Sequence, residues 1–208
     1  LLPEVPVLRC VGRLAFPIFA FFIAEGYAHT RDFGRYFRRL AILAVVSEIP
    51  FNLENGAVFD PARQNVLFTF CLALLTLRGL EALGRERGFG RWAGCGLMLT
   101  AGFAAGELLR TDYGGWGVVT VALLQLCRDG KYAKLWLLLA MAAVNGLGMG
   151  SLTMPVFGGE MPIQIFAVAA LPVIWLYNGQ AGPKGLRRAF YVFYPAHLLA
   201  LEGIRTLT

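Results

Sequence analysis

Charge is scarce in this sequence. Only 15% of its 208 residues are charged, whereas soluble domains carry about 25%. Histidine occurs only twice, and the sequence contains no H-E-x-x-H, P-loop, G-x-G-x-x-G or G-x-S-x-G motif. These absences argue against a zinc peptidase, a nucleotide hydrolase, a dinucleotide-binding domain and a serine hydrolase, and we expect no metal site.

Cysteine pairs of the C-x-x-C kind are also absent. The four cysteines lie in or next to apolar runs, at Cys10, Cys71, Cys95 and Cys127. We therefore expect them to be small buried apolar side chains rather than a disulfide framework.

Long apolar runs dominate what is present, since 57% of the residues are hydrophobic. Eight apolar segments follow one another, at about 11–28, 40–53, 65–83, 92–109, 116–127, 135–152, 163–177 and 189–204. They predict one all-α domain over residues 1–208, a polytopic bundle of membrane-spanning helices. Because several segments are shorter than the ~20 residues of a typical span, we expect a locally thinned bilayer or interfacial extensions. The chain starts at Leu1, and we expect a further segment before it.

Lysine and arginine gather in alternate loops. The loops after the first, third, fifth and seventh segments hold 13 of the 19 Lys and Arg residues. Positively charged loops face the cytoplasm, so this alternation predicts a multi-pass protein of the cytoplasmic membrane with both visible termini outside. The net charge of +6 thus reflects short basic loops between helices and does not indicate a nucleic-acid partner.

Ionisable and polar residues inside or at the ends of the apolar segments predict two layers, because such groups face a bundle interior or line a pathway. The outer layer contains Arg13, Ser47, Glu48, Asn65, Asp112 and Tyr113. The inner layer contains Glu25, Tyr27 and His29. Tyr194 and His197 fall at mid-membrane to outer depth. Two polar layers in one bundle are typical of a route for a group that must cross the membrane.

Three stretches together resemble the TraX family of membrane proteins. They are GRLAFPIFAFFIAEGYAHTRD with RRLAILAVVSEIPFNL, the turn TDYGGWGV, and the C-terminal FYVFYPAHLLAL. The family is named for the protein needed for N-acetylation of conjugative pilin, and the last stretch is similar to the end of acyltransferase-3-type membrane enzymes. The resemblance implies a bacterial inner-membrane acyltransferase. The family pattern also has one more N-terminal helix, ending in an Asp-His pair, before the segment at which this chain starts.

Acyl transfer needs a base for the nucleophile and donors for the oxyanion. We expect His197 to be the base, because imidazoles titrate near neutral pH. Arg13 is predicted to hold a substrate carboxylate or an oxyanion, and Glu48 and Asp112 to orient a histidine or hold an ammonium group. Further substrate-binding candidates are Glu25, His29, Asn65, Tyr113 and Tyr194. Each has a structural alternative, such as helix capping, local pairing with Arg31 or Arg35, or snorkelling to the interface.

The implied acyl donor is acetyl-CoA, with Arg35, Arg38 and Arg39 as candidate phosphate ligands on the cytoplasmic side. Positive-inside topology alone also accounts for these arginines. The acceptor is left open among a pilin N-terminus, a glycan and a lipid-linked sugar. One rival reading is a proton-coupled transporter of a small polar solute, using Glu25, Glu48, Asp112 and His197. Another is an assembly partner of a second membrane protein.

Overall fold

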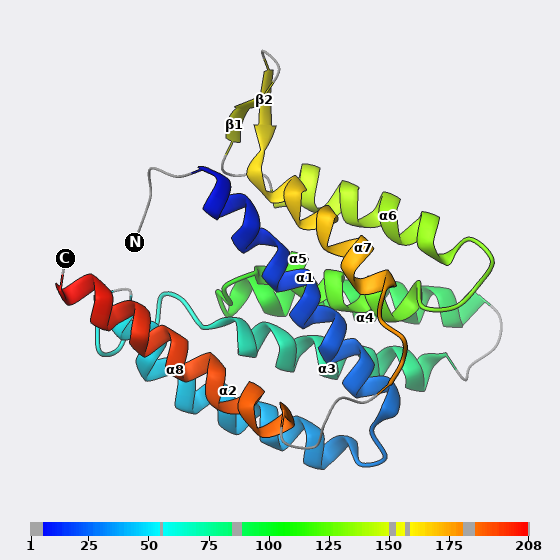
Figure 1. Cartoon of the computed structure of the whole chain (residues 1–208). Coiled ribbons are helices and arrows are strands. Elements are labelled where there is room, and N and C mark those ends of the chain that lie inside the picture. Colours follow the sequence, from blue (N-terminus) through cyan, green and yellow to red (C-terminus); the bar gives the residue numbers. More distant parts are fainter. Residues whose placement is uncertain are drawn as a thin grey trace.

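A computed structural model describes residues 6–54, 56–84, 89–149, 153–156, 159–180 and 186–207. The helices in that part of the chain are α1 (Pro6–His29), α2 (Phe33–Glu54), α3 (Val66–Leu83), α4 (Phe89–Leu108), α5 (Gly114–Leu126), α6 (Ala133–Ala143), α7 (Ala170–Trp175) and α8 (Leu186–Leu207). A π-helical turn, Val144–Gly148, continues α6, and a 3₁₀ helix, Ile163–Ala169, leads into α7. The predicted all-α class is confirmed (Figure 1).

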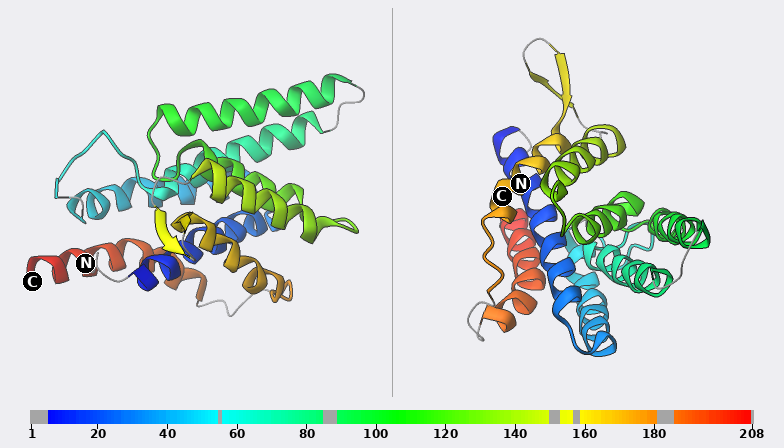
Figure 2. Two further views of the ribbon diagram at one scale, coloured as in Figure 1. Left: turned by 90° about the horizontal axis from the view of Figure 1, so that it is seen from above. Right: turned by 90° about the vertical axis from the view of Figure 1, so that its right-hand side faces the viewer.

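One short antiparallel hairpin interrupts the helices. Strands β1 (Thr153–Val156) and β2 (Gly159–Pro162) pair with Thr153 opposite Pro162. The hairpin projects from one end of the bundle in Figure 1 and in the right-hand view of Figure 2. This stretch lies between the predicted segments 135–152 and 163–177, for which no strands were predicted, so the paired strands are an addition to the prediction.

Helix α2 differs from its prediction at its N-terminal end and at Pro50. It begins at Phe33 rather than near residue 40, because the Asp32 carboxylate accepts a hydrogen bond from the Arg35 N–H at 2.8 Å and so satisfies a first-turn donor. From the sequence, Pro50 is expected to break or cap this helix, and that expectation is wrong. The helix continues through Pro50 to Glu54, although proline has no N–H and so removes one backbone hydrogen bond.

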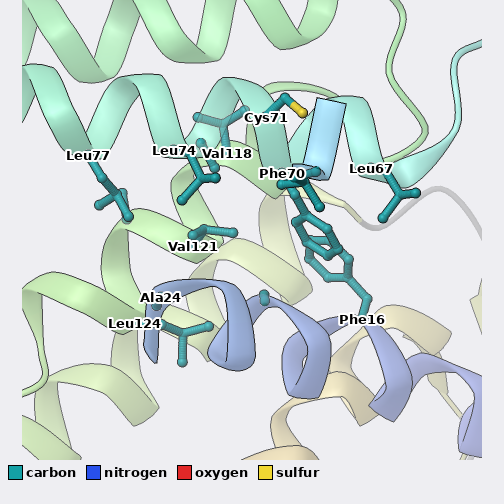
Figure 3. Packing of buried hydrophobic residues seen from close by; sticks show 14 of the residues in the cluster. Phe16, Ala24, Leu67, Phe70, Cys71, Leu74, Leu77, Val118, Val121 and Leu124 are labelled. Atoms are coloured by element: carbon teal, nitrogen blue, oxygen red, sulfur yellow. The ribbon is translucent and has the colours of Figure 1, made fainter. Parts of the chain in front are cut away.

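The apolar core lies where α1, α3 and α5 meet, with α4 and the 3₁₀ helix packed on either side. Figure 3 shows Leu74, Val118 and Val121 from α3 and α5 facing one another, and all three are fully buried. Phe16 of α1 stacks on Phe70 of α3, with ring centroids 5.7 Å apart. Burial of such side chains contributes about 1.5–3 kcal/mol each in water, and tight packing fixes the relative positions of these helices.

Among the described residues, one helix is long and apolar enough to cross a membrane by length and composition. It is α3, with 18 residues and a mean hydropathy of 1.8. The other apolar helices are shorter, at 10–17 residues. Large apolar side chains are nevertheless exposed on outer helices, as at Trp92 (71%), Leu97 (72%) and Trp136 (62%). Exposed apolar surface of this kind indicates contact with a membrane or with protein.

Helix α8 stands at the edge of the bundle. Among the described elements it packs extensively only along α2, and Figure 1 shows these two helices side by side at the lower left. Pro195 lies within α8, and the helix carries Tyr194 and His197 at its middle. This arrangement leaves space between α8 and the central helices, and the candidate site lies there.

Candidate functional site

A cavity of about 1040 Å³ lies among α1, α2, α3 and α8. Most of its wall is apolar or aromatic, and polar groups gather toward its ends. Seven of the residues singled out in the sequence line it: Glu25, His29, Arg39, Asp112, Tyr113, Tyr194 and His197. Part of each predicted polar layer therefore borders this space: Asp112 and Tyr113 of the outer layer, and Glu25 and His29 of the inner layer.

Glu25 and His29 form a polar cluster at one end of the cavity. The His29 Nδ1 atom lies 3.2 Å from the Glu25 carboxylate and 3.0 Å from the Glu25 carbonyl oxygen. Arg128, from the segment between α5 and α6, places its Nη2 atom 2.8 Å from the same carboxylate. The expected local partners, Arg31 and Arg35, are replaced by an arginine 103 residues away.

Two arginines and a tyrosine complete this end. Arg31 and Arg39 line the cavity, as does Tyr36, whose hydroxyl donates to the Ile23 carbonyl oxygen at 3.3 Å. Gly26 makes room for this hydroxyl, since a Cβ there would lie 2.6 Å from it. The cluster combines positive charge with hydrogen-bond donors, which suits binding of an anionic group.

The predicted phosphate ligands do not all meet at this end. Arg39 lines the cavity, whereas Arg35 and Arg38 are outside its lining. Arg35 is exposed and lies 3.4 Å from the Asp32 carboxylate, and Arg38 is also exposed. Arg31, which was not among the predicted cofactor-binding residues, takes a place in the wall instead.

The opposite end of the cavity is built on the turn between α4 and α5. The Gln64 N–H donates to the Arg110 carbonyl at 3.0 Å, which ties this turn to the segment before α3. Asp112 accepts a hydrogen bond from the Arg63 Nη2 atom at 2.6 Å. The Arg63–Asp112 pair joins two segments that are far apart in sequence, and the sequence analysis did not anticipate it.

Tyr113 connects this turn to α1. Its ring stacks on Phe16 with centroids 3.6 Å apart. Burial raises the pKa of the Tyr113 hydroxyl, and the Asp112 charge raises it further. Arg13 lowers the pKa of Tyr113 through its charge and through a hydrogen bond. Arg13 therefore contacts Tyr113, although it does not itself line the cavity.

His197 faces the cavity from α8 with a defined ring orientation. Its Nδ1 atom lies 3.1 Å from the Phe193 carbonyl oxygen. A carbonyl only accepts, so Nδ1 carries the proton and, in the neutral ring, Nε2 keeps a free lone pair. The imidazole stacks on Phe193 at 5.2 Å and meets the edge of Tyr194 at 5.3 Å. This arrangement is suitable for a general base.

Glu48 and Asn65 lie outside the cavity lining and bond to each other. Asn65 is fully buried and precedes α3, where its Oδ1 atom accepts from the Leu67 N–H at 3.0 Å. Its Nδ2 atom donates to the Ala44 carbonyl at 2.9 Å and to the Glu48 carboxylate. The structure thus places both residues in a helix cap that joins α2 to α3.

Sequence reasoning missed several residues of the site, namely Arg31, Arg63, Arg128, Tyr36 and Tyr191. Of these, Arg31, Tyr36 and Tyr191 line the cavity, and the other two pair with its acidic residues. Arg31 and Tyr36 lie close in sequence to predicted site residues, a signal that could have identified them. Arg63 and Arg128 carry no such signal, because their partners are distant in sequence.

Comparisons with known proteins agree with the resemblance seen in the sequence. The family model described as "TraX protein" matches residues 2–205. The probable fimbrial assembly protein FimC, serogroup H1, of Dichelobacter nodosus is 31% identical over 205 residues, which cover 93% of this chain and 81% of that protein. No solved structure matches the chain.

Proposed function

Because the chain belongs to the TraX family, we propose that it is an integral membrane acyltransferase. It transfers an acetyl group from cytoplasmic acetyl-CoA to an amine or hydroxyl acceptor at or beyond the membrane. The observation that supports this most is one cavity among the described residues, which has Arg31 and Arg39 at one end, His197 on its wall and Asp112 with Tyr113 at the other end.

The membrane location is supported by where apolar and basic residues lie. Exposed apolar side chains cover outward faces of α2, α4 and α6, for example Val45, Leu97 and Leu139. Basic residues concentrate in alternate loops, as the positive-inside rule requires. Helices shorter than a full span would be accommodated by local thinning of the bilayer.

Acetyl-CoA as a substrate fits the basic end of the cavity. Arg31 and Arg39 there are suited to phosphate groups, since guanidinium forms bidentate contacts with them. The thioester and its acetyl group would extend along the aromatic wall toward His197. The glutamate at this end, Glu25, is paired with Arg128 and His29, which limits its repulsion of the phosphates.

In the proposed reaction, His197 accepts the proton of the acceptor amine or hydroxyl at Nε2. The acceptor atom attacks the thioester carbon, the carbon–sulfur bond breaks, and the proton passes to the departing thiolate. Tyr113, which lines the outer end, is the candidate donor to the oxyanion, and Arg13 acts through its hydrogen bond to Tyr113. The relative's name, a fimbrial assembly protein, makes the N-terminal amine of a pilus subunit one candidate acceptor.

Transfer from labelled acetyl-CoA by the full-length protein in nanodiscs tests the proposal. We expect transfer or slow hydrolysis with the wild type and a loss of about 100-fold or more with His197→Ala. The matched control is Leu199→Ala on the same helix, where the side chain is half exposed. Equal rates in wild type and His197→Ala would remove His197 as the base, and no turnover in folded protein would refute the transferase.

A proton-coupled transporter is the second candidate, because ionisable groups border both ends of one cavity. It predicts solute uptake by vesicles driven by a proton gradient, and loss of that uptake in Glu25→Gln. Uptake without acetyl transfer would favour the transporter, whereas acetyl transfer without uptake would favour the enzyme.

A further inference from the structure

Three aromatic side chains that line the cavity are also exposed on the surface of the protein. Phe22 of α1, Phe193 of α8 and Tyr177 after α7 all line the cavity, yet they are 43%, 55% and 38% exposed. Side chains that line a space enclosed by packed helices should be buried. Their exposure therefore marks an opening between α1 and α8, which we term the lateral slot, bordered by Phe22, Tyr177 and Phe193.

The packing of α8 explains the slot. This helix has extensive contact with α2 but not with α1 or α3, among the described elements. In the left-hand view of Figure 2, α8 (red) lies along one edge of the bundle. Its exposed residues include Val192 and Leu199 in addition to Phe193. On the α1 side the exposed apolar residue is Phe22. Exposed apolar side chains beside an opening indicate that the opening faces lipid rather than water.

The wall inside the slot favours an alkyl chain over an extended peptide. Between the polar ends the lining is mainly apolar, with Phe19, Phe22, Leu43, Phe51 and Phe70 among its residues. An extended peptide would leave backbone N–H and C=O groups without partners against such a wall, which is energetically costly. A hydrocarbon chain has no polar groups to satisfy.

We propose that the acceptor is an amphiphile that enters sideways from the bilayer through the lateral slot. Its apolar chain lies along the aromatic wall, and its amine or hydroxyl head reaches His197. This inference rests on the proposed transferase function and adds the acceptor class and its route. The charged donor uses the basic end of the cavity, so the two substrates enter by different paths.

The test uses dodecylamine and butylamine as acceptors, together with a dodecylamine analogue that carries a photoactivatable diazirine in its chain, in nanodiscs. We expect the analogue to label α1 and α8, and dodecylamine, but not butylamine, to compete with it. Partition into lipid alone would also favour the longer amine, so variants of the slot are needed. Phe22→Trp fills the slot, so it should lower labelling and raise the KM for dodecylamine by about tenfold. The KM for acetyl-CoA should stay within about twofold of the wild-type value.

The matched control is Leu97→Trp, since this α4 side chain is exposed and lies outside the cavity lining; it should change neither labelling nor KM. Label spread over all lipid-facing helices, or equal effects of the two tryptophans, would overturn the slot even if acetyl transfer is present. Preference for an amine on a hydrophobic helical peptide over dodecylamine would overturn the amphiphile. Slot labelling without any acetyl transfer would keep the binding site and refute the transferase.

Discussion

Replacement of Asn65 by alanine should destabilise the protein strongly without any direct effect on chemistry. The side chain is fully buried and uses both ends of its amide. Its Oδ1 atom caps α3, and loss of such a cap costs about 0.5–2 kcal/mol. Its Nδ2 atom donates to the Glu48 carboxylate, and a hydrogen bond to a charged group contributes about 1.5–3 kcal/mol. The expected loss is therefore about 2–5 kcal/mol.

Two further variants separate these contributions. Asn65→Asp keeps an acceptor for the Leu67 N–H but places a second carboxylate against Glu48. If the cap dominates, this variant should resemble the wild type; if the Glu48 contact dominates, it should be at least as unstable as Asn65→Ala. Adding Glu48→Gln supplies a donor on the opposite side, so the double variant should recover much of the stability, as expected for residues in one hydrogen-bonded network.

The assay is reversible unfolding in detergent, followed by far-ultraviolet circular dichroism. A loss of this size should lower the Tm by on the order of 10 °C. The reasoning would be refuted if Asn65→Ala unfolded within about 0.5 kcal/mol of the wild type, a difference typical of unremarkable surface positions. It would also be refuted if Glu48→Gln failed to improve Asn65→Asp, because the two side chains would then not be coupled as the structure has them.

Three other predictions use the same unfolding assay. Gly106→Ala should lower the free energy of unfolding by about 1–3 kcal/mol, because a Cβ at this position would lie 2.6 Å from the backbone of Gly114. The control is Gly96→Ala, where a Cβ would meet nothing within 4 Å, and this variant should be neutral or slightly more stable. Arg63→Ala should cost less than about 1 kcal/mol despite the 2.6 Å contact with Asp112, since an exposed arginine contributes little, and a larger loss would contradict this. Because burial raises the pKa of the Tyr113 hydroxyl, Tyr113 stabilises the fold below pH ~10, and this contribution is lost as the pH rises above that value. Tyr113→Phe should therefore lose less stability at alkaline pH than the wild type. An unchanged dependence of stability on pH would contradict the burial of this hydroxyl.

Helix existence was predictable from the sequence, but helix limits and type were not. The segment at 65–83 matches α3 closely, because Asn65 is a recognisable cap before an apolar run. The segment at 135–152 is α-helical only as far as Ala143, where α6 passes into a π-helical turn. There the buried Asn145 donates to the Met141 carbonyl at 2.8 Å and accepts from Gln164 at 3.3 Å. Such a departure depends on a partner from another segment, which periodicity does not reveal.

The site shows the same division. Glu25, His197 and Asp112 were selected from the sequence as polar residues of a membrane bundle, and all three line one cavity in the structure, whereas Arg13, Glu48 and Asn65 do not. Their partners were not predictable, because Arg128 and Arg63 join them only through the packing of α1, α3 and α5. Spacing within one helix offered Glu25 only neighbours three or four residues away, and His29 is the one that the structure confirms as a contact.

The two histidines show how environment, rather than residue type, assigns a role. Both line the cavity and both use Nδ1 in a local contact, which leaves Nε2 available. The side chain of His29 is 62% exposed and lies beside a carboxylate already held by Arg128, so it belongs to a charged cluster at an open end. His197 is half-buried, bonds a neutral carbonyl and is flanked by two aromatic rings. A less exposed setting strengthens directed electrostatic interactions and limits hydrolysis, so the proposed acyl-transfer step is better placed at His197, beside the proposed opening for a membrane-borne acceptor.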